Sequence, residues 1–294
     1  MFIPDFNYHK PASLKEAVEI LEKNNDSVPV AGGTDLLVEI KQGLRYHNNI
    51  VSIAGLKELK SIVKDKNELY IGGGVTHNEI ILSQEIMDCI PVLSEVASQI
   101  GTEQIRNTGT IGGNLCTGSS CCDTAPVLIA LGASVEIMGS SGSRIVPISD
   151  FFIDHRKTQV KNGEILTRVM IRIPEPGTGV FYKKFGLREA AAISVASSAV
   201  MVRLENDICI DVSVVTGAVA PTPAICDKAA DILKGKNIAE IRSNTEIIEA
   251  AVEAAAGDSS PIDDVRGSAE YRRSLVGVLV KRAILEALSR AEQS

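Results

Sequence analysis

Three glycine pairs, each closely followed by a small polar residue, constrain the folding of this chain more than any other feature. They lie in Gly32-Gly33-Thr34, in Gly73-Gly74 before Thr76, and in Gly112-Gly113-Asn114. Because glycine has no Cβ, successive backbone N–H groups in such turns can converge on an anion. The pattern indicates either tight turns without a ligand or loops that bind a pyrophosphate.

Two familiar phosphate-binding motifs are missing from the sequence. There is no G-x-x-x-x-G-K-[ST], which excludes a P-loop, and no G-x-G-x-x-G follows an expected strand, which excludes the Rossmann dinucleotide fingerprint. What remains is a pair of separate loops that close on one pyrophosphate, an arrangement that suits a dinucleotide cofactor.

Hydrophobic periodicity predicts helices and strands that are mixed along the chain. Capping-box pairs at Ser13/Glu16 and Thr76/Glu79 indicate two helix starts. The expected strands are 28–31, 49–53, 62–63, 69–71, 134–138, 144–146, 165–173 and 208–214, and the expected helices are 14–21, 90–100, 123–131, 222–233, 244–256 and 268–291. This mixture favours an α+β fold over regular βαβ alternation.

Length and composition set the number of units and the kinds of partner. The 294 residues suffice for two units, and the Pro- and Gly-bearing stretch at 174–179 predicts the division between them. With 30 basic and 37 acidic residues the net charge is −7, and aromatic residues make up only 4% without any Trp. We therefore expect no nucleic-acid partner.

The sequence also limits location and metal content. It has no run of 18 or more apolar residues and no secretory signal at its start, so we expect a cytoplasmic protein without a membrane span. The four histidines, at 9, 47, 77 and 155, lack zinc-site spacing. Of the six cysteines, Cys116, Cys121 and Cys122 fall within seven residues and suggest an iron–sulfur site, but adjacent cysteines do not easily bind two corners of one cluster. We expect free thiols and no metal on this chain.

Three motifs together resemble one family. They are VAGGTD at 30–35, QIRNTGTIGGN at 104–114 and DVRGSAEYRR at 264–273. In order and spacing, from Phe6 to about Leu288, the chain is similar to the medium, FAD-binding subunit of the molybdenum hydroxylases, which include xanthine, carbon monoxide and nicotinate dehydrogenases.

The resemblance implies a fold and a division into domains. It implies an α+β chain whose residues 1–176 form an FAD-binding domain of the vanillyl-alcohol-oxidase type, with subdomains at about 1–55 and 56–176. Residues 177–294 would form a smaller C-terminal α+β domain of the carbon monoxide dehydrogenase flavoprotein type, with a three-stranded sheet and helices.

The resemblance also implies an electron-transfer subunit. FAD, bound non-covalently, would accept electrons from the [2Fe–2S] clusters of a small partner subunit, while a large partner with the molybdenum cofactor oxidises a substrate of the purine/xanthine or carbon monoxide type. The final acceptor would be NAD, ferredoxin or quinone. This chain would supply no catalytic side chain. The alternatives are a standalone FAD oxidoreductase and an assembly subunit that binds no flavin.

The cofactor site implied by the resemblance comprises two loops and six further positions. Its residues are Pro29, Val30, Ala31, Gly32, Gly33, Thr34, Asp35, Leu36, Ile100, Thr110, Ile111, Gly112, Gly113, Asn114, Cys116, Thr117, Asp123, Leu166 and Lys183. The two loops would hold the pyrophosphate and the ribityl chain, and Thr117 would lie beside them.

Several of these positions have a second interpretation. Asp123 is implied as an acceptor for a ribose hydroxyl, or else it caps a helix. Ile100 and Leu166 would flank the adenine. Cys116 would lie against the flavin as an apolar spacer or as a thiol that shifts its potential, and Lys183 would contact the flavin or be an exposed lysine.

Two further matches to the family bear on other roles. The arginines of the third motif, Arg266, Arg272 and Arg273, would fix helix packing or contact partner subunits. One branch of the family, the hydroxybenzoyl-CoA reductases, holds a four-iron cluster in this subunit through an inserted loop, and that insertion is absent here.

Overall fold

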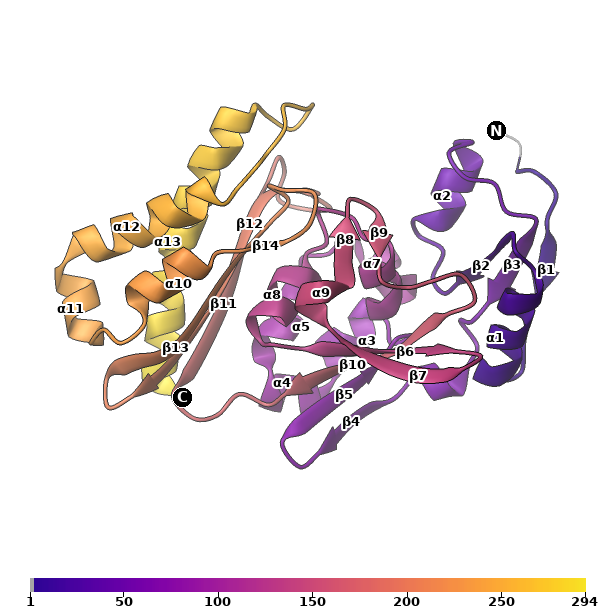
Figure 1. Cartoon of the computed structure of the whole chain (residues 1–294), viewed down its shortest axis with the longest axis horizontal. Helices are drawn as coiled ribbons and strands as arrows, with labels where there is room; N and C mark the ends of the chain where they lie inside the picture. The colour runs from indigo at the N-terminus through magenta and orange to yellow at the C-terminus, as the bar shows by residue number, and fades with distance from the viewer. Residues whose placement is uncertain (1–2) are drawn as a thin grey trace.

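The computed structural model describes residues 3–294 and arranges them as three units in a row (Figure 1). Each unit is built around its own main sheet, and helices cover the sheets. This arrangement confirms the predicted α+β fold. Within residues 3–294, no helix combines the length and apolarity that a membrane crossing requires.

The N-terminal unit is a three-stranded parallel sheet, in the order β1-β3-β2, with one helix packed on it. Helix α1 begins after Ser13, whose Oγ accepts the N–H of Glu16 at 3.2 Å. Its apolar positions Ala17, Val18 and Leu21 are buried, so the expected amphipathic face forms the core of this unit. The elements are β1 (Asn7–His9), α1 (Leu14–Lys23), β2 (Ser27–Val30), α2 (Leu36–Lys41) and β3 (Asn49–Ser52).

The central unit is a five-stranded antiparallel sheet, in the order β4-β5-β10-β6-β7, with seven helices beside it. Its middle strand comes last in sequence, so β10 closes the sheet. The elements are η1 (Lys57–Leu59), β4 (Ile62–Asp65), β5 (Glu68–Gly72), α3 (His77–Leu82), α4 (Gln84–Cys89), α5 (Pro91–Ser98), α6 (Glu103–Thr108), α7 (Ile111–Cys116), α8 (Thr124–Ala130), β6 (Ser134–Gly139), β7 (Gly142–Pro147), α9 (Ile148–Phe151), β8 (Phe152–Asp154), β9 (Lys157–Thr158) and β10 (Ile165–Arg172).

The C-terminal unit is an antiparallel sheet, in the order β11-β12-β13-β14, that lies between the long helix α13 and the central unit (Figure 1). Adjacent residues of β12 face opposite sides of this sheet. Ala199 packs into the core of the central unit with α8, and Val200 packs into the core beneath α13. The elements are β11 (Thr178–Gly186), β12 (Ser194–Glu205), β13 (Ile208–Gly217), β14 (Ala224–Ile225), α10 (Asp227–Leu233), α11 (Ile238–Ser243), α12 (Thr245–Gly257) and α13 (Ala269–Gln293).

Two local expectations for this unit were wrong. The sheet has four strands rather than three, because the two-residue strand β14 pairs with the end of β13. The helix expected at 222–233 begins only at Asp227, because Ala224 and Ile225 pair with Thr216 and Val215 instead. A contact that is distant in sequence therefore overrides the local helical pattern.

A buried carboxylate joins the N-terminal and central units. Glu39 of α2 has a side chain only 8% exposed, and it pairs with Arg45 at 2.9 Å and with Arg156 of the β8–β9 turn. Breaking such a pair leaves an uncompensated buried charge, so the contact fixes how α2 approaches the central unit.

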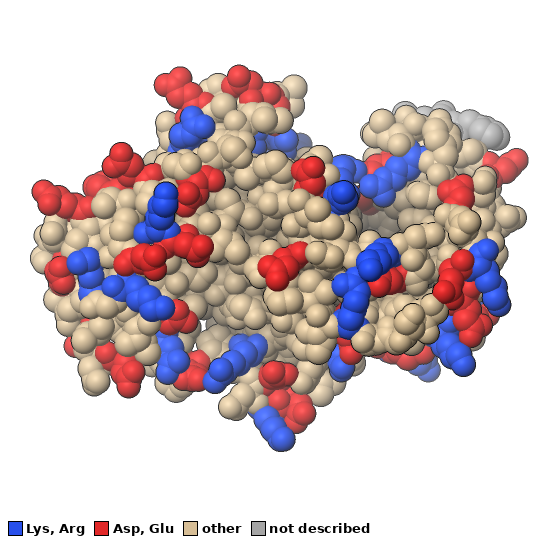
Figure 2. All heavy atoms as spheres, in the orientation of Figure 1, with Lys and Arg blue, Asp and Glu red and all other residues tan. Residues whose placement is uncertain are grey.

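On the face shown in Figure 2, acidic and basic side chains are interspersed.

Packing of β11 against α13 predicts a stability change at Gly179. A Cβ on Gly179 would lie 1.9 Å from the carbonyl oxygen of Ala287, so Gly179→Ala should lower the free energy of unfolding by about 1–3 kcal/mol through overpacking. The matched control is Gly257→Ala in α12, where a Cβ meets nothing within 4 Å. That variant should be as stable as the parent or up to about 1 kcal/mol more stable. Urea unfolding distinguishes the two, and equal stabilities would contradict this packing.

Candidate functional site

The glycine loops lie against one another, backbone to backbone. A Cβ on Gly32, in the loop between β2 and α2, would lie 2.0 Å from the carbonyl oxygen of Thr108 at the end of α6. A Cβ on Gly112 would lie 2.6 Å from the carbonyl oxygen of Gly73, in the turn after β5. Only glycine permits these contacts. We call 29–36 the first loop and 110–114 the second loop. The contact at Gly32 brings the first loop against the end of α6, close to the start of the second loop, and the turn at Gly73 packs against Gly112 of the second loop.

The first loop presents a run of unused donors. Gly33 has a φ of +68°, the left-handed conformation that occurs in anion-binding turns, and α2 begins at Leu36. Within residues 3–294, five successive backbone N–H groups have no acceptor, those of Gly32, Gly33, Thr34, Asp35 and Leu36. A run of free donors beside a left-handed glycine is the combination that an anion-binding turn requires.

The second loop differs, because four of its five backbone donors are already occupied. The N–H groups of Ile111 and Gly112 donate to Val75 and Gly73 carbonyl oxygens, both at 2.9 Å. Those of Gly113 and Asn114 donate to Oγ1 of Thr110 at 3.1 Å and to its carbonyl oxygen at 2.9 Å. The backbone N–H groups of residues 111–114 are therefore engaged within the protein, and among residues 110–114 only that of Thr110 has no acceptor within residues 3–294.

The second loop instead offers side chains and an open glycine. Oδ1 of Asn114 accepts from Thr124 Oγ1 at 2.7 Å and from Cys122 Sγ at 3.1 Å. Its Nδ2 has no acceptor among residues 3–294 and is available to a ligand. A Cβ on Gly113 would meet only Thr110 Oγ1, at 3.0 Å, and Thr117 Oγ1 donates to the Gly113 carbonyl at 2.9 Å.

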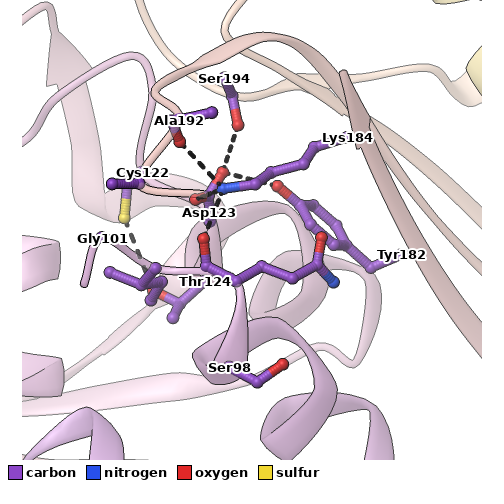
Figure 3. A network of polar contacts seen from close by, with 12 residues as sticks. Ser98, Gly101, Cys122, Asp123, Thr124, Tyr182, Lys184, Ala192 and Ser194 are labelled. Carbon is purple, nitrogen blue, oxygen red and sulfur yellow. Dashed lines mark hydrogen bonds and ion pairs between the residues drawn. The ribbon is translucent and has the colours of Figure 1, made fainter. Parts of the chain in front are cut away.

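A buried polar network lies where the central and C-terminal units meet (Figure 3). Oδ1 of Asp123 accepts from Tyr182 at 2.7 Å and from Ser194 at 2.5 Å, and Oδ2 pairs with Lys184 at 2.7 Å. Burial and the nearby Asp123 carboxylate raise the pKa of Tyr182 well above its usual value, so its hydroxyl stays protonated as a donor.

The network bears on both interpretations of Asp123. This residue precedes α8, but its side chain makes no hydrogen bond that caps the helix. Both carboxylate oxygens are engaged by side chains of β11 and β12. Its principal contacts in this structure therefore join two units, which neither interpretation anticipated.

Neighbouring lysines of β11 point to opposite faces of the sheet. Lys184 lies on the same face as Tyr182 and reaches Asp123. Lys183 is exposed on the other face, where it lines a surface hollow with Phe181 and Arg282 of α13. Because side chains alternate along a strand, the structure does not bring Lys183 to the loops or to the network.

The apolar and sulfur positions lie close to the loops. Leu166 in β10 is buried, with Cδ2 3.2 Å from a Cβ placed on Gly73. Ile100 follows α5 and is half-buried, and its carbonyl accepts from Arg106 at 3.0 Å. Burial raises the pKa of the Cys116 and Cys122 thiols to about 12, so both stay protonated at neutral pH. A neutral thiol suits the spacer interpretation of Cys116.

The remaining motif residues hold the C-terminal unit in place. Arg272 is 3% exposed and donates to the carbonyl oxygens of Val195 at 3.2 Å and Ile262 at 2.9 Å. Arg266 pairs with Asp264 at 2.7 Å and donates to Sγ of Cys121 at 2.8 Å. Across residues 3–294, no group of three or more His, Cys, Asp or Glu is arranged to hold a metal ion.

A cavity of about 390 Å³ opens beside the network. Residues at the end of α5 and in α6 form one wall, and the loop after β11 forms the other. Its lining includes Ser98, Gln99, Gly101, Thr102, Arg106 and, from the loop, Glu189, Ala190 and Ala191.

His77 is the first residue of α3 and lies beside the loops without having been singled out from the sequence. Its backbone N–H donates to the Gly109 carbonyl at 3.0 Å, its side chain is almost fully buried, and Nδ1 has no partner among residues 3–294. Burial lowers the pKa of His77 to about 4, with a smaller lowering by the charge of Arg106 and an opposing effect of the Asp123 carboxylate.

Sequence reasoning also missed Tyr182, Lys184 and Ser194. One signal was available once the strand β11 is known: Tyr182 and Lys184 are two apart in it and so share a face. No local signal marks which face meets Asp123, and His77 resembles any helix-starting residue after a capping Thr.

Family models match both parts of the chain. Residues 4–176 match the FAD binding domain in molybdopterin dehydrogenase, and residues 181–287 match the CO dehydrogenase flavoprotein C-terminal domain.

Individual proteins are similar over nearly the whole chain. A carbon monoxide dehydrogenase medium chain from Afipia carboxidovorans is 32% identical over 288 residues, which is 98% of both chains. A xanthine dehydrogenase FAD-binding subunit from Escherichia coli O157:H7 is 31% identical over 287 residues, 97% of both. Among solved structures, a chain of the carbon monoxide dehydrogenase from Hydrogenophaga pseudoflava matches with a TM-score of 0.94 at 30% identity, covering 99% of both.

The buried His77 predicts a specific loss of stability in mild acid. The folded chain keeps this imidazole neutral down to about pH 4, whereas an unfolded chain protonates it near pH 6.5. Above pH 6.5 this difference does not affect the free energy of unfolding. As the pH falls toward 4, only the unfolded chain takes up the proton, so the free energy of unfolding decreases by on the order of 3 kcal/mol. His77→Phe should lack this part of the pH dependence. Urea unfolding at pH 7 and pH 4.5 measures it, and the same loss in both proteins would contradict the assignment.

Proposed function

We propose an electron-transfer role for this chain, which belongs to the FAD-binding medium subunits of the molybdenum hydroxylase family and is therefore a subunit of an oxidoreductase. In this role it binds FAD, receives electrons from the [2Fe–2S] clusters of a small partner subunit and passes them to an external acceptor. When bound, FAD supplies the chemistry, because it exchanges electrons singly or in pairs.

The observation that carries the proposal is the set of five free backbone N–H groups at 32–36. A doubly charged pyrophosphate matches a row of donors at the start of α2. In the second loop, Asn114 offers the free N–H groups of Nδ2, and a Cβ on Gly113 would meet only Thr110 Oγ1. The residues present therefore fit a dinucleotide such as FAD.

Within this proposal the expected residues take different parts. The loop 29–36 binds the pyrophosphate through its backbone, and the loop 110–114 binds through side chains, with Thr117 holding its shape. Ile100, Cys116 and Leu166 supply apolar contacts. We leave Lys183 out of the site, since it faces α13.

We also propose that 1–176 and 177–294 act as two domains, the first subdivided at about residue 55. Residues 173–177 connect β10 and β11 without helix or strand, which supports the main boundary. The second domain contributes Tyr182, Lys184 and Ser194 to the network at the site.

Substrate oxidation is assigned to another polypeptide in this account. The relatives named for carbon monoxide and for xanthine are 32% and 31% identical to this chain. Sequence identity therefore does not indicate which of these substrates the complex oxidises. We propose a large molybdenum-cofactor subunit as the partner that binds substrate.

If the purified full chain shows no flavin absorbance at about 450 nm after incubation with FAD, the alternative of an assembly subunit that binds no flavin replaces this proposal.

The open surface of Gly113 predicts a selective effect on FAD. Gly113→Val adds a side chain where the protein leaves space, so it should weaken FAD binding about 100-fold or more by blocking approach of the phosphates. Fluorescence titration of the apoprotein with FAD measures this effect.

The matched control is Gly257→Val in α12, where a Cβ meets nothing within 4 Å. It should bind FAD as the parent does, and circular dichroism should show both variants folded. Parent-like FAD affinity in folded Gly113→Val would contradict the placement of the phosphates.

A further inference from the structure

The first loop is connected to the central unit on both of its sides. On one side, Gly32 packs against the carbonyl oxygen of Thr108 in the central unit. On the other, Glu39 pairs with Arg156 of the β8–β9 turn, which lies on the side of the central unit that faces α2 (Figure 1). The backbone N–H of Glu39 donates to the Asp35 carbonyl at 2.9 Å, so the position of Glu39 is tied to that of the loop.

The same turn contacts the segment that follows the second loop. The backbone N–H of Arg156 donates to the Gly118 carbonyl at 2.7 Å. Gly118 has a φ of +61°, and a Cβ there would lie 3.1 Å from the Cα of Arg156, so the turn packs directly on this glycine. Gly118 comes shortly after α7, whose first residues belong to the second loop. Arg156 therefore contacts the segments that carry both loops, one through its side chain and the other through its backbone.

The second partner of Glu39 lies in a different unit from the first. Arg45 pairs with Glu39 at 2.9 Å, and both residues belong to the N-terminal unit. Because a buried carboxylate without a partner is strongly destabilising, either arginine keeps Glu39 paired when the other is lost. The effect of the contact between the units can therefore be separated from the effect of burying a charge.

Contacts on both sides of a segment restrict its movement more than a contact on one side. The pair of Glu39 and Arg156 restrains α2, and with it the first loop, against movement away from the second loop. The five free N–H groups of the first loop lie along the chain between Gly32 and Glu39. A site whose donors are already in place loses less conformational freedom when a ligand binds.

We propose that Arg156 is a positioning residue for the dinucleotide: through Glu39 it holds the free donors of the first loop at the separation from the second loop that a bound pyrophosphate requires. Both side chains act through the position of the loop, and neither touches the cofactor. This inference rests on the proposed FAD site.

Four variants of the full chain test the inference. Arg156→Met removes the guanidinium and keeps a long side chain, and Glu39→Gln removes the charge of its partner with little change of shape. The double variant Glu39→Gln/Arg156→Met shows whether the two residues act together. Arg45→Met is the matched control, because it removes the other partner of the same carboxylate and leaves the contact between the units in place. Each apoprotein is titrated with FAD by flavin fluorescence, and its melting temperature is measured.

We expect Arg156→Met, Glu39→Gln and the double variant each to bind FAD about tenfold more weakly than the parent, equivalent to about 1.4 kcal/mol. The double variant should bind no more weakly than the single variants, because either substitution already breaks the pair. Arg45→Met should bind FAD as the parent does.

Lower melting temperatures with parent-like FAD affinity would assign the pair a purely structural role and overturn the inference. Weaker binding in Arg156→Met alone, or losses that add in the double variant, would mean that the guanidinium acts directly on the cofactor and would also overturn it. So would an equal loss of affinity in Arg45→Met. If Arg156→Met folds poorly, Glu39→Gln and Arg45→Met carry the test. Failure of the parent chain to bind FAD would count against the proposed function instead.

Discussion

Backbone-to-backbone contact at three glycines is the constraint on which the rest of the site depends. Gly32 lies against Thr108, and Gly112 lies against Gly73, so loops from two sheets share one surface. Any Cβ at Gly32 or Gly112 would separate them by more than side-chain movement can absorb. The same packing occupies most backbone donors of the second loop, because the N–H groups of Ile111 and Gly112 pair with the turn at 73–75 and those of Gly113 and Asn114 pair with Thr110. Close packing therefore leaves anion binding to the first loop.

An electrostatic contact connects the central and C-terminal units. The carboxylate of Asp123 and the ammonium of Lys184 are both 9% exposed and share their remaining hydrogen bonds with Tyr182, Ser194 and two carbonyl oxygens. A fully satisfied buried network specifies one arrangement of its parts. Here it fixes the cavity wall after β11 relative to α5, whereas Glu39 and its two arginines fix the N-terminal unit.

Much of this fold could be predicted from the sequence, and the limits have physical causes. The apolar spacing in 14–21 and the capping Thr76 are local signals, and both helices form as expected. The helix predicted to begin at residue 222 begins later, because β14 pairs with β13 and the local sequence pattern does not show this nonlocal contact. The family resemblance, now borne out, supplied the architecture. It did not supply the face of β11 that meets Asp123, because one residue of register exchanges Lys183 for Lys184.

The central claim is that one loop binds the pyrophosphate through its backbone and the other contacts it through side chains. A crystal structure of the full chain with FAD tests this directly. The account predicts pyrophosphate oxygens within hydrogen-bond distance of backbone N–H groups in 32–36, with Asn114 Nδ2 on the opposite side. A pyrophosphate bound away from these N–H groups, or held by the backbone of Gly112 and Gly113, would contradict it.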